Sequence, residues 1–171
     1  MATGQENKLR GAAGEFLVAA ELCRRGLLAT PFAGNVPYFD IIACGKSKGH
    51  VAIQVKAIDQ SRSKWWQFDI RKYIDVQMDA DGKHQKIGAL QSEPYEGLMF
   101  VLVELMDTGK DKFFILEWSA LRDILASKYR GDLAEHGYLR PRNPESFHTA
   151  IGEDAIRKYQ DDWEAIVRRV S

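Results

Sequence analysis

The chain has 171 residues, a length that suits one domain with a substantial hydrophobic core. Its 24 Lys and Arg residues balance its 24 Asp and Glu residues, so no overall charge attracts it to nucleic acid or to a membrane surface. No uncharged apolar run is long enough to span a bilayer, which excludes an integral membrane helix. No signal peptide is evident at the N-terminus, and a cytoplasmic location is therefore expected.

The first predicted element is a helix that begins near Asn7 and stops at Gly26. Its apolar stripe consists of Leu9, Ala12, Ala13, Phe16, Ala20 and Cys23. Gly11 and Gly14 each weaken the helix by roughly 1 kcal/mol relative to Ala. Two glycines one turn apart indicate the close approach of a backbone or a ligand. Glu15 lies beside them and is either a solvated carboxylate or part of a site.

A short strand is expected over residues 27–32, followed by a hairpin from Tyr38 to Ile58 with a loop rich in Gly, Lys and Ser. Polar residues interrupt its two apolar runs. Gln54 and Lys56 project from the same face of the second strand, because side chains alternate along a strand. If the loop is centred on Ser47, Asp40 lies directly opposite Gln54. Burying such groups is costly unless they are paired or ligate a metal, so this patch is the main functional clue.

Basic residues and aromatic residues are interleaved within and after the hairpin, from Ile41 to Lys72. The surface predicted to contact phosphates and to stack on bases comprises Lys46, Lys48, Arg62, Lys64, Trp65, Trp66, Arg71 and Lys72. The alternative is a solvated loop whose tryptophans cover the edge of the core. Two cysteines, Cys23 and Cys44, fall inside predicted regular elements without metal-ligand spacing, and we expect buried free thiols.

The remaining elements indicate an α/β fold with helices packed on a mixed, mostly antiparallel sheet. Residues 70–78 are ambiguous between helix and strand, and 79–82 read as a turn. An apolar run at 97–106 predicts a central strand, with a hairpin partner at 112–118. Ser119 is expected to cap a helix to about Tyr129, and a final helix is expected over 152–170. We expect a single domain over 1–171, with a core at about 7–130 and a helical C-terminal extension at about 131–171.

The polar patch has the oxygen ligands that Mg²⁺ or Mn²⁺ prefers. Asp40 supplies a carboxylate, Gln54 an amide oxygen and Val55 a backbone carbonyl, and Glu15 completes the set if the first helix packs there. Zinc is disfavoured, because the chain lacks a Cys/His cluster. A bound metal lowers the pKa of a water molecule and neutralises charge on a scissile phosphate. Lys56 is placed to orient that water or to stabilise the developing charge.

These residues resemble a known nuclease superfamily. Gly11-x-x-Gly14-Glu15 on a helix, then Tyr38-Phe39-Asp40 and Gln54-Val55-Lys56, are similar to the PD-(D/E)xK motifs of restriction endonucleases and Holliday-junction resolvases. The resemblance covers about residues 9–66 and implies a restriction-endonuclease-like sheet flanked by helices. It also implies a metal-dependent DNA endonuclease, with Glu15, Asp40 and Gln54 at the metal positions and Lys56 as the catalytic lysine. Pro37 does not directly precede Asp40, and Gln54 replaces the usual acid.

Two other interpretations remain open. The chain can be a nucleic-acid-binding module that has lost catalysis through Gln54. It can also be a structural or assembly protein in which Asp40 and Lys56 form a buried ion pair. A homodimer or higher homo-oligomer is expected for an enzyme that cuts both DNA strands, since two strands need two sites.

Overall fold

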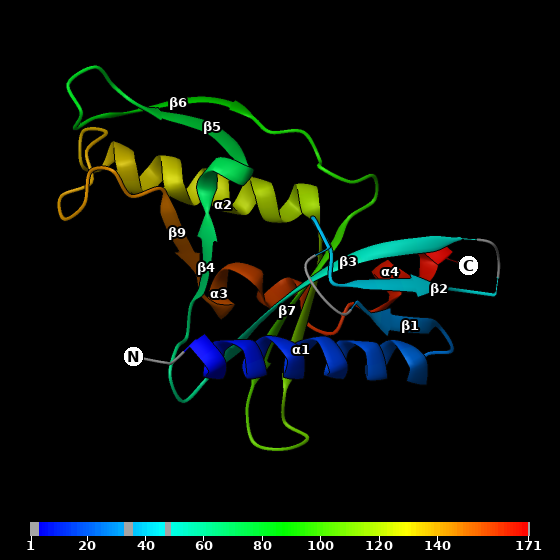
Figure 1. The fold of residues 1–171 in the computed structure, drawn as a ribbon. Coiled ribbons are helices and arrows are strands. Elements are labelled where there is room, and N and C mark those ends of the chain that lie inside the picture. The colour runs from blue at the N-terminus through cyan, green and yellow to red at the C-terminus, as the bar shows by residue number, and fades with distance from the viewer. Residues whose placement is uncertain (1–3, 33–35, 47–48, 171) are drawn as a thin grey trace. The chain divides into compact units, whose positions relative to one another are not determined.

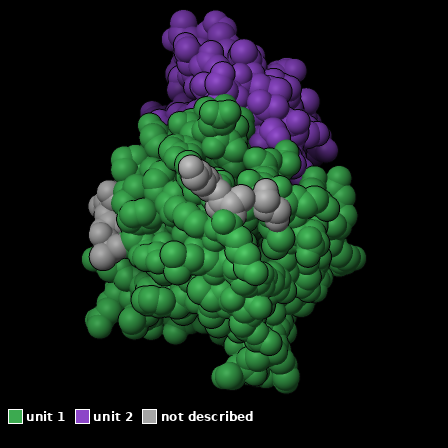
Figure 2. Space-filling model, turned by 90° about the vertical axis from the view of Figure 1, so that its right-hand side faces the viewer, with its two compact units in different colours: residues 1–66, 93–118, 152–171 green, residues 67–92, 119–151 purple. Residues whose placement is uncertain are grey.

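The computed structural model describes residues 4–32, 36–46 and 49–170. The chain divides into two compact units (Figure 2). Unit 1 consists of residues 1–66, 93–118 and 152–171, and unit 2 consists of residues 67–92 and 119–151. Residues 152–171, which the sequence placed in a C-terminal extension, therefore belong to the same unit as the predicted hairpin.

Unit 1 is built on a five-stranded mixed sheet (Figure 1). Its strands are β1 (Leu28–Pro31), β2 (Ile41–Cys44), β3 (His50–Asp59), β7 (Met99–Leu105) and β8 (Lys112–Glu117), in the order β1-β2-β3-β7-β8. The β3–β7 pair is parallel and the other pairs are antiparallel. This confirms the α/β class, the mixed sheet and the β7–β8 hairpin. The run predicted as a central strand is β7, which is buried along nearly its whole length.

The register of the β2–β3 hairpin is the one expected from its sequence. Ile41 pairs with Ile53 and Cys44 pairs with His50, so the same register places position 40 opposite Gln54. The β2 and β3 strands both contribute alternate residues to the core, where Ile41, Ala43 and Ile53 are buried. Ser47 and Lys48, at the tip of this hairpin, lie outside the described residues.

The first helix, α1 (Gly4–Arg24), packs with the opposite face from the predicted one. Its buried residues are Gly14, Val18, Ala19 and Leu22. Leu9 and Phe16, two members of the predicted stripe, are 65% and 66% exposed. Cys23 is also exposed, which corrects the expectation of a buried thiol there, and Cys44 is partly buried. Gly26 ends the helix with φ = 84°, as predicted.

Gly14 explains which face of α1 was selected. A Cβ atom at this position would lie 2.7 Å from the Cβ of Ala57 and 3.5 Å from Cγ1 of Val55, both on β3. Only a residue without a side chain allows α1 to come this close to the sheet. A Cβ at Gly11 would meet nothing within 4 Å. The close approach inferred from the two glycines is therefore confirmed at Gly14 alone.

The C-terminal segment does not form the single helix expected over 152–170. It is divided into α3 (Glu153–Ile156), the 3₁₀ turn η2 (Arg157–Tyr159) and α4 (Glu164–Val170). Asp161 adopts a left-handed backbone with φ = 54°, which a continuous helix does not allow. The predicted apolar residues Trp163, Ile166 and Val170 are nevertheless buried, and they join α1 and the sheet in one core.

Unit 2 contains the rest of the secondary structure. Its elements are β4 (Trp66–Asp69, beginning at the last residue of unit 1), η1 (Ile70–Lys72), β5 (Ile74–Met78), β6 (Gln85–Leu90), α2 (Trp118–Ala134, whose first residue is in unit 1) and β9 (His148–Ile151). β4 pairs with β9, and β5 pairs with β6. The ambiguous segment 70–78 is thus a 3₁₀ turn and a strand, and 79–82 is a turn as predicted. The helix α2 already begins at Trp118, so Ser119 lies inside its first turn and is not its cap.

The resemblance implies a core of one helix, three strands, a second helix and a further strand, and the connection between the parallel strands β3 and β7 departs from that order. Between these strands the chain forms β4, η1, β5 and β6, with no α-helix among the elements of the described residues.

Within the described part of the chain, no helix is long and apolar enough to cross a membrane.

Candidate functional site

Asp40 lies at the point where β2 and β3 diverge. Its backbone N–H donates to the carbonyl of Ile53, 2.9 Å away, just before β2 begins at Ile41. Its carboxylate accepts the backbone N–H of Val55 through Oδ2 at 2.8 Å, and the same oxygen accepts a hydrogen bond from the Gln54 amide nitrogen. The predicted meeting of Asp40 and Gln54 is therefore confirmed. The pairing of β2 with β3 ends at Ile41 and Ile53, and the half-buried Asp40 carboxylate accepts the next N–H on that side of β3, from Val55.

Glu15 comes close to the same place from α1. The approach of α1 to β3 at Gly14 brings the next residue, Glu15, within electrostatic range of Asp40. Burial raises the pKa of Glu15, and the charge of Asp40 raises it further. Burial also raises the pKa of Asp40, although the Val55 N–H, the Lys56 charge and the Gln54 amide oppose that rise. Two partly buried carboxylates thus repel each other, and a cation between them relieves that repulsion.

Lys56 lies on β3 two residues after Gln54, and both side chains are partly buried, whereas Val55 between them is buried. Its charge lowers the pKa of Asp40, which places the two groups in the same electrostatic environment. The backbone carbonyl of Lys56 accepts the indole N–H of Trp66 at 3.1 Å. Trp66 is fully buried and packs edge-on against Phe114 of β8. This tryptophan anchors the strand at Lys56.

A divalent cation at this site would have two carboxylates as ligands and would need further oxygen ligands. Within the residues that the structure describes, no group of three or more His, Cys, Asp or Glu side chains is placed to hold a metal ion. Glu15 and Asp40 supply two carboxylates, so further ligands must be neutral oxygens or water, as Mg²⁺ accepts. In a strand the N–H and C=O of one residue face the same neighbour, so the Val55 carbonyl faces the Asp40 side together with its N–H. Gln54 presents its amide nitrogen to Asp40, and its oxygen becomes a ligand there only if the amide turns.

The predicted nucleic-acid surface is only partly available. Lys46 and Lys64 are exposed, and Lys48 lies outside the described residues. Trp65 is 53% exposed, with its ring against Gly152. The buried position of Trp66 means that it cannot stack on a base, which corrects the sequence interpretation. Trp66 is the first residue of β4, whose alternate residues Trp66 and Phe68 are buried, whereas Trp65 precedes the strand.

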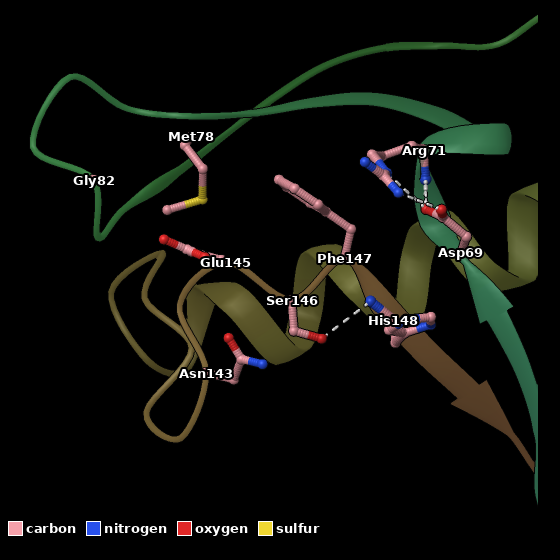
Figure 3. A pocket seen from close by; sticks show the side chains of 9 residues that line it. All are labelled: Asp69, Arg71, Met78, Gly82, Asn143, Glu145, Ser146, Phe147 and His148. Carbon is pink, nitrogen blue, oxygen red and sulfur yellow. Dashed lines mark hydrogen bonds and ion pairs between the residues drawn. The ribbon is translucent and has the colours of Figure 1, made fainter.

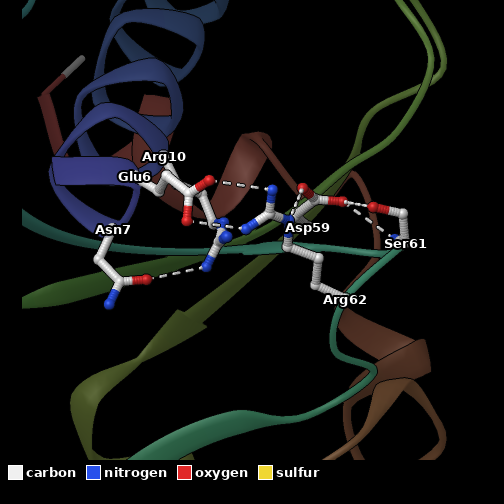
Figure 4. Close-up of polar contacts among 6 residues, drawn as sticks. All are labelled: Glu6, Asn7, Arg10, Asp59, Ser61 and Arg62. Carbon is white, nitrogen blue, oxygen red and sulfur yellow. Dashed lines mark hydrogen bonds and ion pairs between the residues drawn. The ribbon is translucent and has the colours of Figure 1, made fainter. Parts of the chain in front are cut away.

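Arg62 is already paired within unit 1. Its guanidinium donates to both carboxylate oxygens of Glu6 on α1, at 3.0 and 3.3 Å, and lies 3.7 Å from Asp59 (Figure 4). Asp59 also accepts from the backbone and hydroxyl of Ser61, which lowers its pKa. Because Arg62 is already paired, its positive charge is less available to a phosphate than the sequence indicated.

Arg71 and Lys72 belong to unit 2, whereas Glu15, Asp40, Gln54 and Lys56 belong to unit 1. Arg71 lines a hollow of about 640 Å³ in unit 2 (Figure 3). Its guanidinium pairs with Asp69 at 2.6 Å and lies 4.9 Å from the ring centre of Phe147. The hydrogen bonds from Arg71 lower the pKa of Asp69, although burial opposes that shift. The charge of Arg71 is thus compensated inside its own unit.

Sequence reasoning gave no role to four aromatic residues around Asp40. The rings of Phe32 and Phe39 are 5.6 Å apart, and those of Phe39 and Tyr95 are 5.1 Å apart, both edge-to-face. Tyr38 is 57% exposed and has φ = 76°, a backbone conformation that costs a bulky residue on the order of 1–3 kcal/mol. The aromatic pair before Asp40 was visible in the sequence. Its exposure and the contribution of Tyr95 were not, because they depend on the fold.

Comparison with known proteins adds no assignment. No protein-family model, no curated protein and no solved structure matches the chain.

Proposed function

We propose that this protein is a metal-dependent endonuclease that hydrolyses phosphodiester bonds in DNA, on a restriction-endonuclease-like sheet. The observation that carries the proposal is the convergence of Glu15, Asp40, Gln54 and Lys56 at the middle of β3, just beyond its pairing with β2. Burial raises the pKa of both Glu15 and Asp40, and the charge of Asp40 raises that of Glu15 further, so a Mg²⁺ or Mn²⁺ ion would stabilise both carboxylates in their ionised form.

Each residue has a separate task in this reaction. Glu15, Asp40, the Val55 carbonyl and, after its amide turns, Gln54 would hold the ion. The ion, when bound, supplies positive charge at the scissile phosphate and acidifies a water molecule. The Lys56 ammonium donates hydrogen bonds to the attacking water or to a phosphate oxygen, which orients the water and stabilises the charge that develops. Trp66 holds the backbone of Lys56, so the lysine stem starts from a fixed point.

The test is cleavage of end-labelled DNA with Mg²⁺ or Mn²⁺, with EDTA as the negative control. Asp40→Asn and Lys56→Ala should each reduce the rate by at least 100-fold. A matched pair of controls is available in the β7–β8 turn, where Asp107 and Lys110 form an exposed ion pair 3.4 Å long. Asp107→Asn and Lys110→Ala should leave the rate unchanged. Cleavage that survives both site substitutions refutes the proposal.

One observation favours a second candidate, a DNA-binding module without catalysis. The Gln54 amide nitrogen already satisfies Asp40, so the carboxylate has a partner without a metal. A protein of this kind binds DNA in a salt-dependent way and cuts nothing with any divalent ion. Isothermal titration with Mn²⁺ separates the candidates, because only the nuclease binds the ion and loses that binding in Asp40→Asn. Cutting both strands of a duplex requires two sites, which a two-fold dimer of this chain supplies.

A further inference from the structure

Three aromatic residues near Asp40 form a continuous row of ring contacts at the surface of unit 1, and Tyr38 precedes one of them, Phe39, in the chain. The backbone N–H of Phe32 donates to the carbonyl of Asp40 at 2.9 Å, so Phe32 lies directly beside the candidate site. Phe39 packs edge-on against Phe32 on one side and against Tyr95 on the other. Phe39 and Tyr95 are partly buried and make a floor, whereas Phe32 is 42% exposed and Tyr38 is more than half exposed.

The conformation of Tyr38 is not explained by packing. Its φ of 76° is one that glycine adopts without strain. Because its ring is exposed, packing contacts offset little of the backbone strain energy. Strain of this kind concentrates at binding sites and catalytic sites. Tyr38 precedes Asp40 by two residues, a span of at most about 7 Å, so its ring is within reach of a nucleotide whose phosphate lies at Asp40.

The composition of this surface favours contact with the base of a nucleotide over contact with its phosphate. The described segments that carry it, 27–32, 36–44 and 92–98, contain no Lys or Arg, and Glu93 and Glu96 flank Tyr95. The guanidinium of Arg169, which reaches the Gly97 carbonyl from α4, is paired with Glu117. A phosphate therefore finds little free positive charge there, whereas an uncharged base can stack on exposed rings. In a duplex both faces of each base are covered by its neighbours, so only an unpaired base can use the surface.

We propose that Phe32 and Tyr38, on a floor of Phe39 and Tyr95, form a stacking platform for one unpaired nucleobase beside Asp40. This inference rests on the proposed nuclease function, and it names the substrate class as DNA with an unpaired nucleotide next to the cleaved bond, such as a single strand or a flap.

The experiment measures binding rather than cutting. A single-stranded oligonucleotide that contains 2-aminopurine, whose fluorescence falls on stacking, is titrated with the full-length protein in EDTA. A duplex of the same length is titrated in parallel. Tyr38→Gly removes the ring and relieves the backbone strain, and Phe32→Ala removes the second ring. We expect each variant to bind the single strand about tenfold more weakly, with less quenching, and to bind the duplex unchanged.

The matched control is Tyr138, which is 50% exposed and has φ = 63°. It follows α2 in unit 2, where a helix end accounts for its backbone, since its N–H bonds to the Leu133 carbonyl. Tyr138→Gly should leave both titrations unchanged. Equal single-strand binding by Tyr38→Gly and the unmodified protein overturns the platform, as does an equal loss on single strand and duplex. A change in oligomeric state without a change in DNA binding also overturns it, because the rings then contact protein.

The cleavage assay and this titration can refute the nuclease function and the stacking platform independently of each other. If no divalent ion supports cutting but the Tyr38→Gly effect is present, the nuclease function is wrong and the platform stands. If cutting occurs at equal rates on paired and unpaired DNA, and stacking is absent, the platform is wrong and the nuclease function stands.

Discussion

Gly14 provides the sharpest test of how the site is assembled. In Gly14→Ala the new Cβ would lie 2.7 Å from the Cβ of Ala57, where ordinary contacts are 3.4–4 Å, so α1 must move away from β3 by about 1 Å. Overpacking of this kind costs about 1–3 kcal/mol, and the better helix propensity of Ala returns about 1 kcal/mol. Gly11→Ala gains the same propensity and meets nothing within 4 Å, so it should be stabilising by about 1 kcal/mol.

The difference between the two variants isolates the close approach, because both gain the same propensity. Urea unfolding of the metal-free protein, extrapolated to water, should place Gly14→Ala about 1–3 kcal/mol below Gly11→Ala. Glu15 follows Gly14 in the helix, so the displaced helix should also raise the Mn²⁺ concentration that half-saturates cleavage. Equal stabilisation by both substitutions would refute the argument that Gly14 sets the distance between α1 and β3.

Three further substitutions test the electrostatics and the anchoring of the site. Burial raises the folded-state pKa of Asp40, so its ionised form destabilises the metal-free protein once the pH rises through that value. Asp40→Asn should therefore be more stable than the unmodified protein at pH 7 by about 0.5–2 kcal/mol, and equal to it near pH 4. Thermal melts in EDTA measure both differences. Gln54→Glu should bind Mn²⁺ about tenfold more tightly in a calorimetric titration. Its loss of the hydrogen bond to Asp40 should lower the stability of the metal-free protein by about 1.5–3 kcal/mol. An unchanged affinity for Mn²⁺ would show that Gln54 is not a metal ligand. Trp66→Phe leaves the Lys56 carbonyl without its indole donor and should lower the free energy of unfolding by about 1–3 kcal/mol. It should also lower the cleavage rate by a larger factor than the affinity for DNA. Equal falls in rate and affinity would contradict a positioning role for Trp66.

The hairpin could be predicted because its information is local. Alternating β-branched residues and a Gly-rich loop define the two strands, and their pairing fixes Asp40 opposite Gln54. The strands β7 and β8 were equally visible, since a buried strand needs a continuous apolar run.

The packing face of α1 could not be predicted from hydropathy. Apolar residues lie on both faces of this helix, and Leu9 and Phe16 give the outer face the stronger pattern. The inner face was selected by Gly14, which has no side chain and therefore adds nothing to a hydrophobic stripe. The same limit applies to the C-terminal segment, where Trp163, Ile166 and Val170 keep a helical spacing although Asp161 interrupts the helix before them.

The β5–β6 hairpin was missed for the opposite reason. Most of β6 is exposed, so its residues carry little of the apolar alternation that marks a strand. The aromatic surface around Asp40 was missed because Tyr95 reaches it from a distant part of the chain, and only the fold brings that ring to Phe39.

The order of the strands has a consequence for how this protein can be divided. All four candidate site residues precede the turn at 79–82, whereas β7, β8 and α4 follow it. A chain severed in that turn leaves one fragment with the candidate site residues and another with two of the five strands of the sheet. The parallel pairing of β3 with β7, from Ile53 to Asp59, must then rejoin them without a covalent link. The two fragments are natural halves of a split protein, in which activity would report their reassembly.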